Sequence, residues 1–174
     1  MKNNRAIQLS INYGGHDTSA ALSINQKIVS ANEQERFDLL KHSRKFPLAA
    51  ISSCLRSQNL DINNVDRLII TTDFNKAKIL KKRVRDKKKN EMIFKIRNDL
   101  GYQGPIVTFD HHLCHLASAY FPSGFKKSII MSIDGVGQFQ TAKLAVADKG
   151  KIKICKFKAS YPNSLGLIYS ALTF

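Results

Sequence analysis

A short internal repeat constrains the fold of this 174-residue chain more than any other feature. Residues 10–24 align without gaps to residues 132–146, at a constant offset of 122. Both segments have the pattern of a strand, a glycine-containing turn, a strand, a polar turn and a strand. A period of this length excludes a solenoid and predicts two related lobes, each opening with a meander of strands. The identical pairs are Ser10/Ser132, Ile11/Ile133, Gly15/Gly137, Ala20/Ala142 and Leu22/Leu144.

Strands and helices are expected to alternate along the rest of the chain, which is typical of an α/β fold. We expect a first lobe over about 1–125 and the start of a second over about 126–174, with a basic helical segment at 76–99. The expected strands are 6–13, 19–24, 27–32, 67–72, 105–109, 128–133, 141–147 and 151–157, and the expected helices, besides the basic segment, are 47–55, 111–121 and 164–173.

The positive charge of the chain is concentrated in one segment. The net charge is +15, and residues 76–97 hold 11 basic side chains against Asp86 and Glu91. Apolar residues recur there at roughly helical spacing, which indicates a solvated helix with one apolar stripe. A contact with the phosphate backbone of a nucleic acid is the alternative, but Phe94 is the only aromatic residue of the segment. A nucleic-acid partner is therefore not expected.

The chain has three cysteines without CxxC spacing, which fits a reducing compartment. No apolar run approaches the roughly 20 residues of a membrane helix, and no secretory signal is visible. We therefore expect a cytoplasmic chain without a membrane partner.

Both turns of the repeat have the composition of an anion-binding loop, because glycine lets backbone N–H groups approach a phosphate closely. A hairpin turn also needs glycine for its geometry, so the pair of loops is more informative than either alone. The predicted phosphate or nucleotide contacts are Gly14, Gly15, Asp17, Thr18 and Ser19 in the first loop and Gly135 and Gly137 in the second.

The motif DHHLCH at residues 110–115 predicts a metal site. Asp110 can cap a helix on which His111 and His115, at i and i+4, share one face. His112 points about 100° away from His111. Asp134, at the end of the next strand, is the expected third ligand. Two imidazoles and a carboxylate suit iron, zinc or manganese, and we expect Cys114 to be a packed residue instead.

His16 and the pair Lys41–His42 are the remaining candidates for chemistry, although a turn histidine and a solvated lysine would explain them equally well.

These motifs resemble the NodU/CmcH family of O-carbamoyltransferases. The matching stretches are GGHDTSAALSINQKIVSANEQERF, KHSRKFP, DHHLCHLASAYFPSGF, SIDGVGQ and YPNSLGLIYSALTF, in the order of the family. The resemblance implies an actin-like ATPase (ribonuclease H-like) fold with duplicated meanders. It also implies that ATP and carbamoyl phosphate form a carbamoyl-adenylate, from which the carbamoyl group passes to a hydroxyl of a small-molecule acceptor, an antibiotic or a sugar.

The resemblance further assigns roles to residues. His111, His115 and Asp134 would bind a divalent metal (iron, zinc, manganese or magnesium), while His16 and Lys41 would belong to the transfer site. Gln138 stands where the family has Glu. Members are several times longer, so we expect a truncated N-terminal part, inactive alone, which a second polypeptide could complete. The alternatives are a tRNA threonylcarbamoyl transferase-like enzyme and a non-enzymatic, basic nucleic-acid-binding module.

Overall fold

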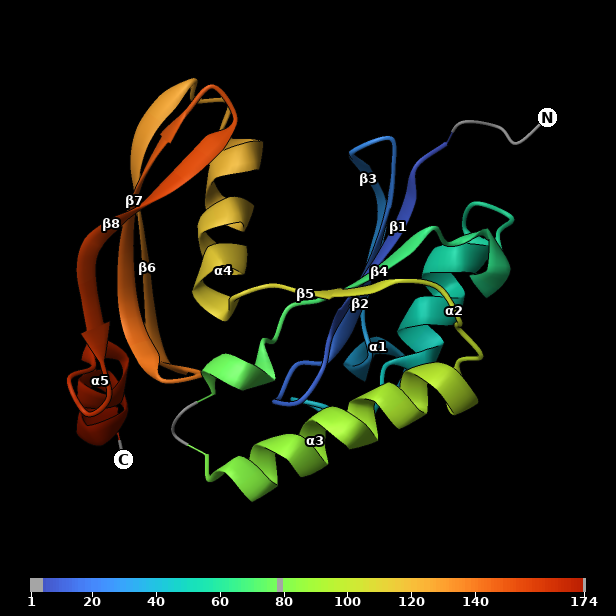
Figure 1. Cartoon of the computed structure of the whole chain (residues 1–174), viewed down its shortest axis with the longest axis horizontal. Coiled ribbons are helices and arrows are strands. Elements are labelled where there is room, and N and C mark those ends of the chain that lie inside the picture. Colours follow the sequence, from blue (N-terminus) through green and yellow to red (C-terminus); the bar gives the residue numbers. More distant parts are fainter. Residues whose placement is uncertain (1–4, 78–79, 174) are drawn as a thin grey trace. The chain divides into compact units, whose positions relative to one another are not determined.

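The computed structural model describes residues 5–77 and 80–173. The chain forms two compact units (Figure 1). Unit 1 holds the described residues of 1–72 and 83–109, and unit 2 holds those of 73–82 and 110–174. No helix in these described ranges is both long and apolar enough to cross a membrane.

Unit 1 is built on a five-stranded sheet of order β3-β2-β1-β4-β5. The strands β1 (Ile7–Asn12), β2 (Ser19–Ile24) and β3 (Lys27–Glu33) form the predicted antiparallel meander. Next to β1, the strands β4 (Arg67–Ile70) and β5 (Ile106–Thr108) are added in parallel. Short helical turns lie at α1 (Glu35–Asp38), η1 (Ile62–Asn64) and η2 (Phe74–Lys76), the last of them in unit 2.

The core of unit 1 lies on one face of this sheet. Ile7, Leu9 and Ile11 of β1 are buried there, since alternate side chains of a strand share a face. The helix α2 (Leu48–Arg56) begins directly after Pro47 and packs against β2 and β3. Its apolar stripe, which Cys54 shares, is buried against this face.

The basic segment is helical, as predicted, over α3 (Lys82–Phe94) and the wider turn η3 (Lys95–Asp99). Met92 and Ile96 are buried, while most of the cationic side chains are exposed. Residues 78 and 79 of the segment lie outside the described ranges.

Unit 2 contains a second antiparallel meander of β6 (Lys127–Gly137), β7 (Gln140–Asp148) and β8 (Lys151–Ser160). On one side of it lie α4 (His111–Tyr120) and the turn η4 (Phe121–Ser123). Leu116 and Tyr120 of α4 form a core cluster with Ile130, Ala145 and Ala147. For this reason α4 belongs to unit 2, and the units divide after Phe109 instead of near residue 125. The chain continues into α5 (Leu165–Thr173).

The strand register repeats at the offset seen in the sequence. In unit 1 the pairs are Ile7–Ile24, Leu9–Leu22 and Ile11–Ala20. In unit 2 they are Ile129–Val146, Met131–Leu144 and Ile133–Ala142, each displaced by 122 positions. The first two strands of the two meanders are therefore equivalent position by position.

The prediction of a turn at residues 134–137 is wrong. β6 continues to Gly137, with a shift of register between Ile133 and Gly137, and the turn is made by Gln138 and Phe139. Gly137 still pairs with Gln140, so residues 134–137 continue the strand and contain an irregularity in its pairing with β7. In the first copy, by contrast, residues 13–18 form an open loop.

Candidate metal centre and loop cluster

The first turn of α4 is anchored to the sheet of unit 2 by the predicted cap. The carboxylate of Asp110 accepts a hydrogen bond from the N–H of Leu113 (3.0 Å) and from Nζ of Lys143 on β7 (2.6 Å). Both carboxylate and lysine are nearly buried. This arrangement determines where the histidines of α4 lie relative to β6.

The structure brings together the three predicted metal ligands. Nε2 of His111 lies 3.0 Å from Nε2 of His115 and 2.9 Å from Oδ2 of Asp134. Nε2 of His115 lies 3.9 Å from the same carboxylate oxygen. One turn of helix separates the two histidines, and β6 presents Asp134 to both.

The protonation states of these groups suit a metal. The hydrogen bond with His111 lowers the pKa of Asp134 to about 2, against the opposing effect of burial. Burial, followed by the proximity of His111, lowers the pKa of His115. An ionised carboxylate and a neutral imidazole are the forms that coordinate a divalent cation. Two imidazoles and one carboxylate therefore fit iron, zinc or manganese.

Two further residues of the DHHLCH motif, His112 and Cys114, are not part of this cluster of ligands. His112 is buried, with Nδ1 2.8 Å from Oγ of Ser132 and Nε2 2.9 Å from the carbonyl of Gln140. Because the carbonyl oxygen can only accept a hydrogen bond, Nε2 of His112 carries the proton, and Nδ1 accepts a hydrogen bond from the serine hydroxyl. Burial raises the pKa of Cys114 to about 11, which keeps it a thiol and a poor ligand.

Gly137 is packed against the cluster. A Cβ atom at this position would lie 2.5 Å from Cδ2 of His111, 2.7 Å from Nε2 of His112 and 3.0 Å from Oδ2 of Asp134. A Cβ at Gly135 would meet nothing within 4 Å. Position 137 therefore requires glycine, because an added Cβ would collide with the rings of His111 and His112.

Two residues outside the predicted set hold the centre in place. Gln138 accepts from the N–H of His111 (3.2 Å) and donates to the carbonyl of Asp73 (2.6 Å). Oγ of Ser164 lies 2.7 Å from the carbonyl of Gly135 and accepts from the N–H of Leu167, which ties the start of α5 to β6. A serine directly before a helix pattern is a cap signal and could have revealed this role.

A pocket of about 290 Å³ lies beside the centre within unit 2. It is lined by Gly137 and Gln138 and by the cationic side chains of Lys76, Lys143 and Lys158. Lys76 and Lys143 both pair with Asp110. Asp110 also lines the pocket, so three lysines face one carboxylate there, and the net positive charge of this lining suits an anion.

The first loop contains a second cluster, in unit 1. Oδ2 of Asp17 lies 2.5 Å from Nδ1 of His16, and Oδ1 lies 2.8 Å from Nδ1 of His42. The hydrogen bonds from His16 and then His42 lower the pKa of Asp17. Asp17 and His42 both have positive φ, of 55° and 58°, which are uncommon values for non-glycine residues. His42 therefore shares the carboxylate of Asp17 with His16, whereas its neighbour Lys41 does not. The side chain of Lys41 is exposed and has no partner among the described residues.

The other predicted phosphate contacts of this loop divide into two groups. Gly14, with φ 110°, and Gly15 are exposed and leave their backbone accessible. Thr18 is fully buried, and its hydroxyl donates to the carbonyl of Lys45 (2.8 Å). The expected contact of Thr18 with a phosphate stays a prediction, and in the structure its hydroxyl holds the loop to residues 43–45.

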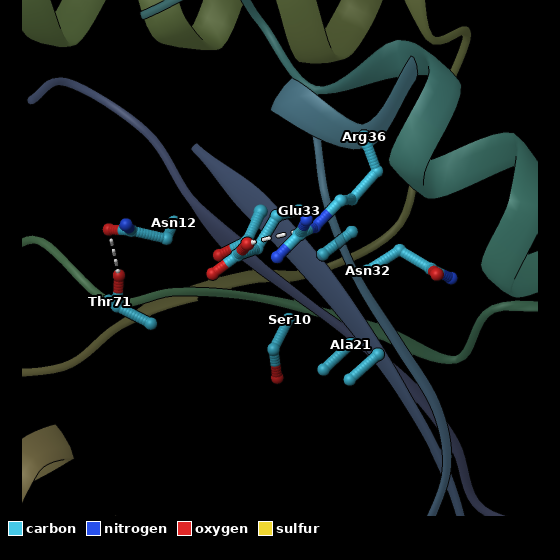
Figure 2. Close-up of a pocket in the computed structure, with 10 residues that line it drawn as sticks. Ser10, Asn12, Ala21, Asn32, Glu33, Arg36 and Thr71 are labelled. Atoms are coloured by element: carbon cyan, nitrogen blue, oxygen red, sulfur yellow. Dashed lines mark hydrogen bonds and ion pairs between the residues drawn. The ribbon is translucent and has the colours of Figure 1, made fainter. Parts of the chain in front are cut away.

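Ser19 lines a larger pocket, of about 550 Å³, on the polar face of the sheet of unit 1. Figure 2 shows Asn12 bonded to Thr71 and the ion pair of Glu33 and Arg36 at this pocket. Because Ser10 and Asn12 point away from the core, the pocket opens on the opposite side of β1 from Leu9 and Ile11.

Solved structures with a similar fold define the fold class. The chain superposes on YeaZ from Pseudomonas aeruginosa with a TM-score of 0.54 and 14% identity, covering 90% of this chain and 67% of that one. The type II Ppx/GppA phosphatase of Aquifex aeolicus gives a TM-score of 0.50 and 12% identity, covering 97% and 55%. The fold is that of the actin-like ATPases, as predicted.

Sequence comparisons define the family. A family described as "Carbamoyltransferase N-terminus" matches residues 73–174. The nodulation protein NolNO of Sinorhizobium fredii is 31% identical over 170 residues (88% of this chain, 24% of that protein). The uncharacterized protein sll1178 of Synechocystis is 30% identical over 188 residues (91% and 30%). The chain belongs to the carbamoyltransferase family and spans about a quarter to three tenths of the length of these relatives.

Proposed function

We propose that this chain supplies the N-terminal part of an ATP-dependent O-carbamoyltransferase that acts on a hydroxyl of a small-molecule acceptor, such as an antibiotic or a sugar. The observation that carries the proposal is the convergence of His111, His115 and Asp134 in a chain of the carbamoyltransferase family. A divalent metal held by these residues would supply positive charge for a phosphate or carbamoyl oxygen.

In the proposed reaction, water hydrolyses carbamoyl phosphate to carbamate and inorganic phosphate. The carbamate then attacks the α-phosphate of ATP, which expels pyrophosphate and forms a carbamoyl-adenylate. The acceptor hydroxyl then attacks the carbamoyl carbon, AMP leaves, and the hydroxyl proton passes to a base. His16 is the candidate for this base, because its imidazole is exposed and its Nδ1 is held by Asp17. The side chain of Lys41 is exposed next to His42 and would offset the negative charge of the AMP that leaves.

The anion contacts would come from exposed backbone at Gly14 and Gly15 in unit 1 and from the lysine-lined pocket beside Gly137 in unit 2. Asp17 holds the two histidines and Thr18 holds the loop, so neither side chain is left to contact a phosphate. Gly135 supports the centre through its bond to Asp134.

A chimera tests the proposal, with this chain replacing the matching region of NolNO. We expect it to transfer radiolabelled carbamoyl groups from carbamoyl phosphate to a hydroxyl acceptor only in the presence of ATP, while the 174-residue chain alone gives no turnover. Lys41→Met should lower the transfer rate, with Lys27→Met, another exposed lysine of unit 1, as the matched control. Label that enters tRNA instead of the small acceptor would contradict the proposal, as would activity that survives His111→Ala.

A further inference from the structure

The loop cluster of unit 1 has the same donor set as the candidate metal centre of unit 2. It consists of His16, Asp17 and His42, and one ligand atom from each of them lies within 4.8 Å of the other two. The Nδ1 atoms of His16 and His42 approach the two carboxylate oxygens of Asp17 at 2.5 Å and 2.8 Å. Two imidazole nitrogens and a carboxylate thus converge, which is an arrangement that divalent transition metals favour.

The two chain segments that carry the loop cluster are held together by other hydrogen bonds. The N–H of Thr18 donates to the carbonyl of Ser43 (3.1 Å), and its hydroxyl donates to the carbonyl of Lys45 (2.8 Å). The N–H of His42 donates to Oε2 of Glu35 (2.9 Å). None of these bonds uses a ligand atom of the cluster. The three side chains are therefore brought together by the fold and do not need an ion to assemble them.

The loop cluster is open to solvent. The side chains of His16 and His42 are 69% and 63% exposed, and that of Asp17 is 41% exposed. An ion can therefore reach the cluster without opening the core, and water can fill the coordination positions that the three side chains leave free. The adjacent lysines Lys41 and Lys45 are likewise exposed, so solvent screens their repulsion of a cation. These surroundings suit an exchangeable ion, whereas a structural zinc site is closed by four protein ligands.

Without a metal, protons occupy the positions between the ligand atoms. An ionised carboxylate only accepts hydrogen bonds, so each Nδ1 atom must carry a proton to donate to Asp17. The hydrogen bonds from His16 and then His42 lower the pKa of Asp17, which keeps this carboxylate ionised at neutral pH. A neutral imidazole with its proton on Nε2 instead presents the lone pair of Nδ1 to a metal. A cation can therefore replace both protons at the centre of the cluster.

We propose that His16, Asp17 and His42 form a second metal site, which binds a divalent transition-metal ion such as Zn²⁺ through both Nδ1 atoms and the carboxylate. The binding does not depend on the proposed carbamoyl transfer. Its consequence for His16 does rest on that function, because an imidazole that binds a metal at Nδ1 carries its proton on Nε2 and cannot accept the proton of an acceptor hydroxyl. Occupation of the site then inhibits the transfer.

The test measures Zn²⁺ bound to the full chain after the ligands of unit 2 have been removed. The double variant His111→Ala/His115→Ala should still bind about one Zn²⁺ per chain in equilibrium dialysis, because the loop cluster is intact. Adding His42→Ala should abolish this binding. Adding Arg44→Ala is the matched control, since Arg44 is an exposed residue of the same loop, and should leave the binding unchanged. Co²⁺ in place of Zn²⁺ should give visible absorption bands that disappear with His42→Ala.

A measurement on the parent chain makes the test independent of the folding of the variants. Zn²⁺ should shift the NMR signals of the ring nitrogens of His16 and His42 to the pattern of a proton on Nε2. The proposal is overturned if these signals do not change, if the double variant binds no Zn²⁺, or if Arg44→Ala lowers the binding as much as His42→Ala. Zn²⁺ that binds as expected but does not slow carbamoyl transfer by the NolNO chimera would refute the assignment of His16 as the base and leave the metal site standing.

Discussion

The missing side chain of Gly137 leaves the space that the ring of His111 occupies, since an added Cβ would lie 2.5 Å from Cδ2 of the histidine. We expect Gly137→Ala to displace His111, because the second ring in contact, that of His112, is fixed in the core. The affinity of the chain for Zn²⁺ or Mn²⁺ should fall about 10- to 100-fold, the usual effect of disturbing the surroundings of metal ligands.

Gly135→Ala is the matched control, because its Cβ would meet nothing within 4 Å. Isothermal titration calorimetry on both variants measures the difference. Equal loss of affinity in the two variants would show that backbone freedom, and not space for the histidine, explains both glycines.

Substitution of the three histidines of α4 should separate ligands from packing. His111→Ala and His115→Ala should each lower the bound metal, measured by mass spectrometry of metal content, because their Nε2 atoms converge on Asp134. His112→Ala should leave metal content nearly unchanged and instead lower the free energy of unfolding by about 1–3 kcal/mol, since it removes hydrogen bonds to Ser132 and Gln140. Equal metal loss from all three variants would contradict this assignment.

The two equivalent isoleucines Ile11 and Ile133 should respond differently to truncation. Ile11→Ala leaves a cavity in unit 1 and should lower the free energy of unfolding by about 2–5 kcal/mol. Ile133→Ala removes a half-exposed side chain and should change it by less than about 0.5 kcal/mol. Urea unfolding followed by circular dichroism makes the comparison, and comparable losses would mean that the face of β6 is covered in solution.

Acidification should loosen the loop that presents Lys41 and His42. The hydrogen bond from the Ser43 hydroxyl to Asp38 (2.7 Å), followed by that from the N–H of Leu40, lowers the pKa of Asp38 below its ordinary 3.8. A folded-state pKa below the unfolded value stabilises the fold above about pH 3.8, and this stabilisation is lost as the pH falls through the folded value.

Asp38→Asn should therefore be less stable than the parent at pH 6, and the difference should shrink below pH 4. Thermal unfolding at a series of pH values provides the measurement. A difference that stays constant between pH 6 and pH 3 would assign the effect of the substitution to shape and not to charge.

Local sequence patterns were sufficient to predict most of the helices and strands. The strand alternation in residues 7–33, the Pro47 start of α2 and the Asp110 cap of α4 depend on neighbours in the chain, and the structure contains all of them. The i and i+4 spacing of His111 and His115 places them on one helical face whatever the surroundings.

Residues whose role depends on distant parts of the chain were harder to predict. The buried hydroxyl of Thr18 donates to the carbonyl of Lys45, 27 positions along the chain, and the pairing of His42 with Asp17 spans 25 positions. The extension of β6 to Gly137 depends on Gln140 across the hairpin. No local pattern carries these contacts.

The α/β class, the repeat at offset 122 and the histidine pair can be predicted from the chain alone, because each follows from periodicity or spacing along it. The folded structure was needed to show that Asp134 reaches both histidines, that Gly137 makes room for them and that the face of Ile129 is open while that of Ile7 is closed. Burial and close approach depend on which elements pack together, and identical strand patterns can have different neighbours.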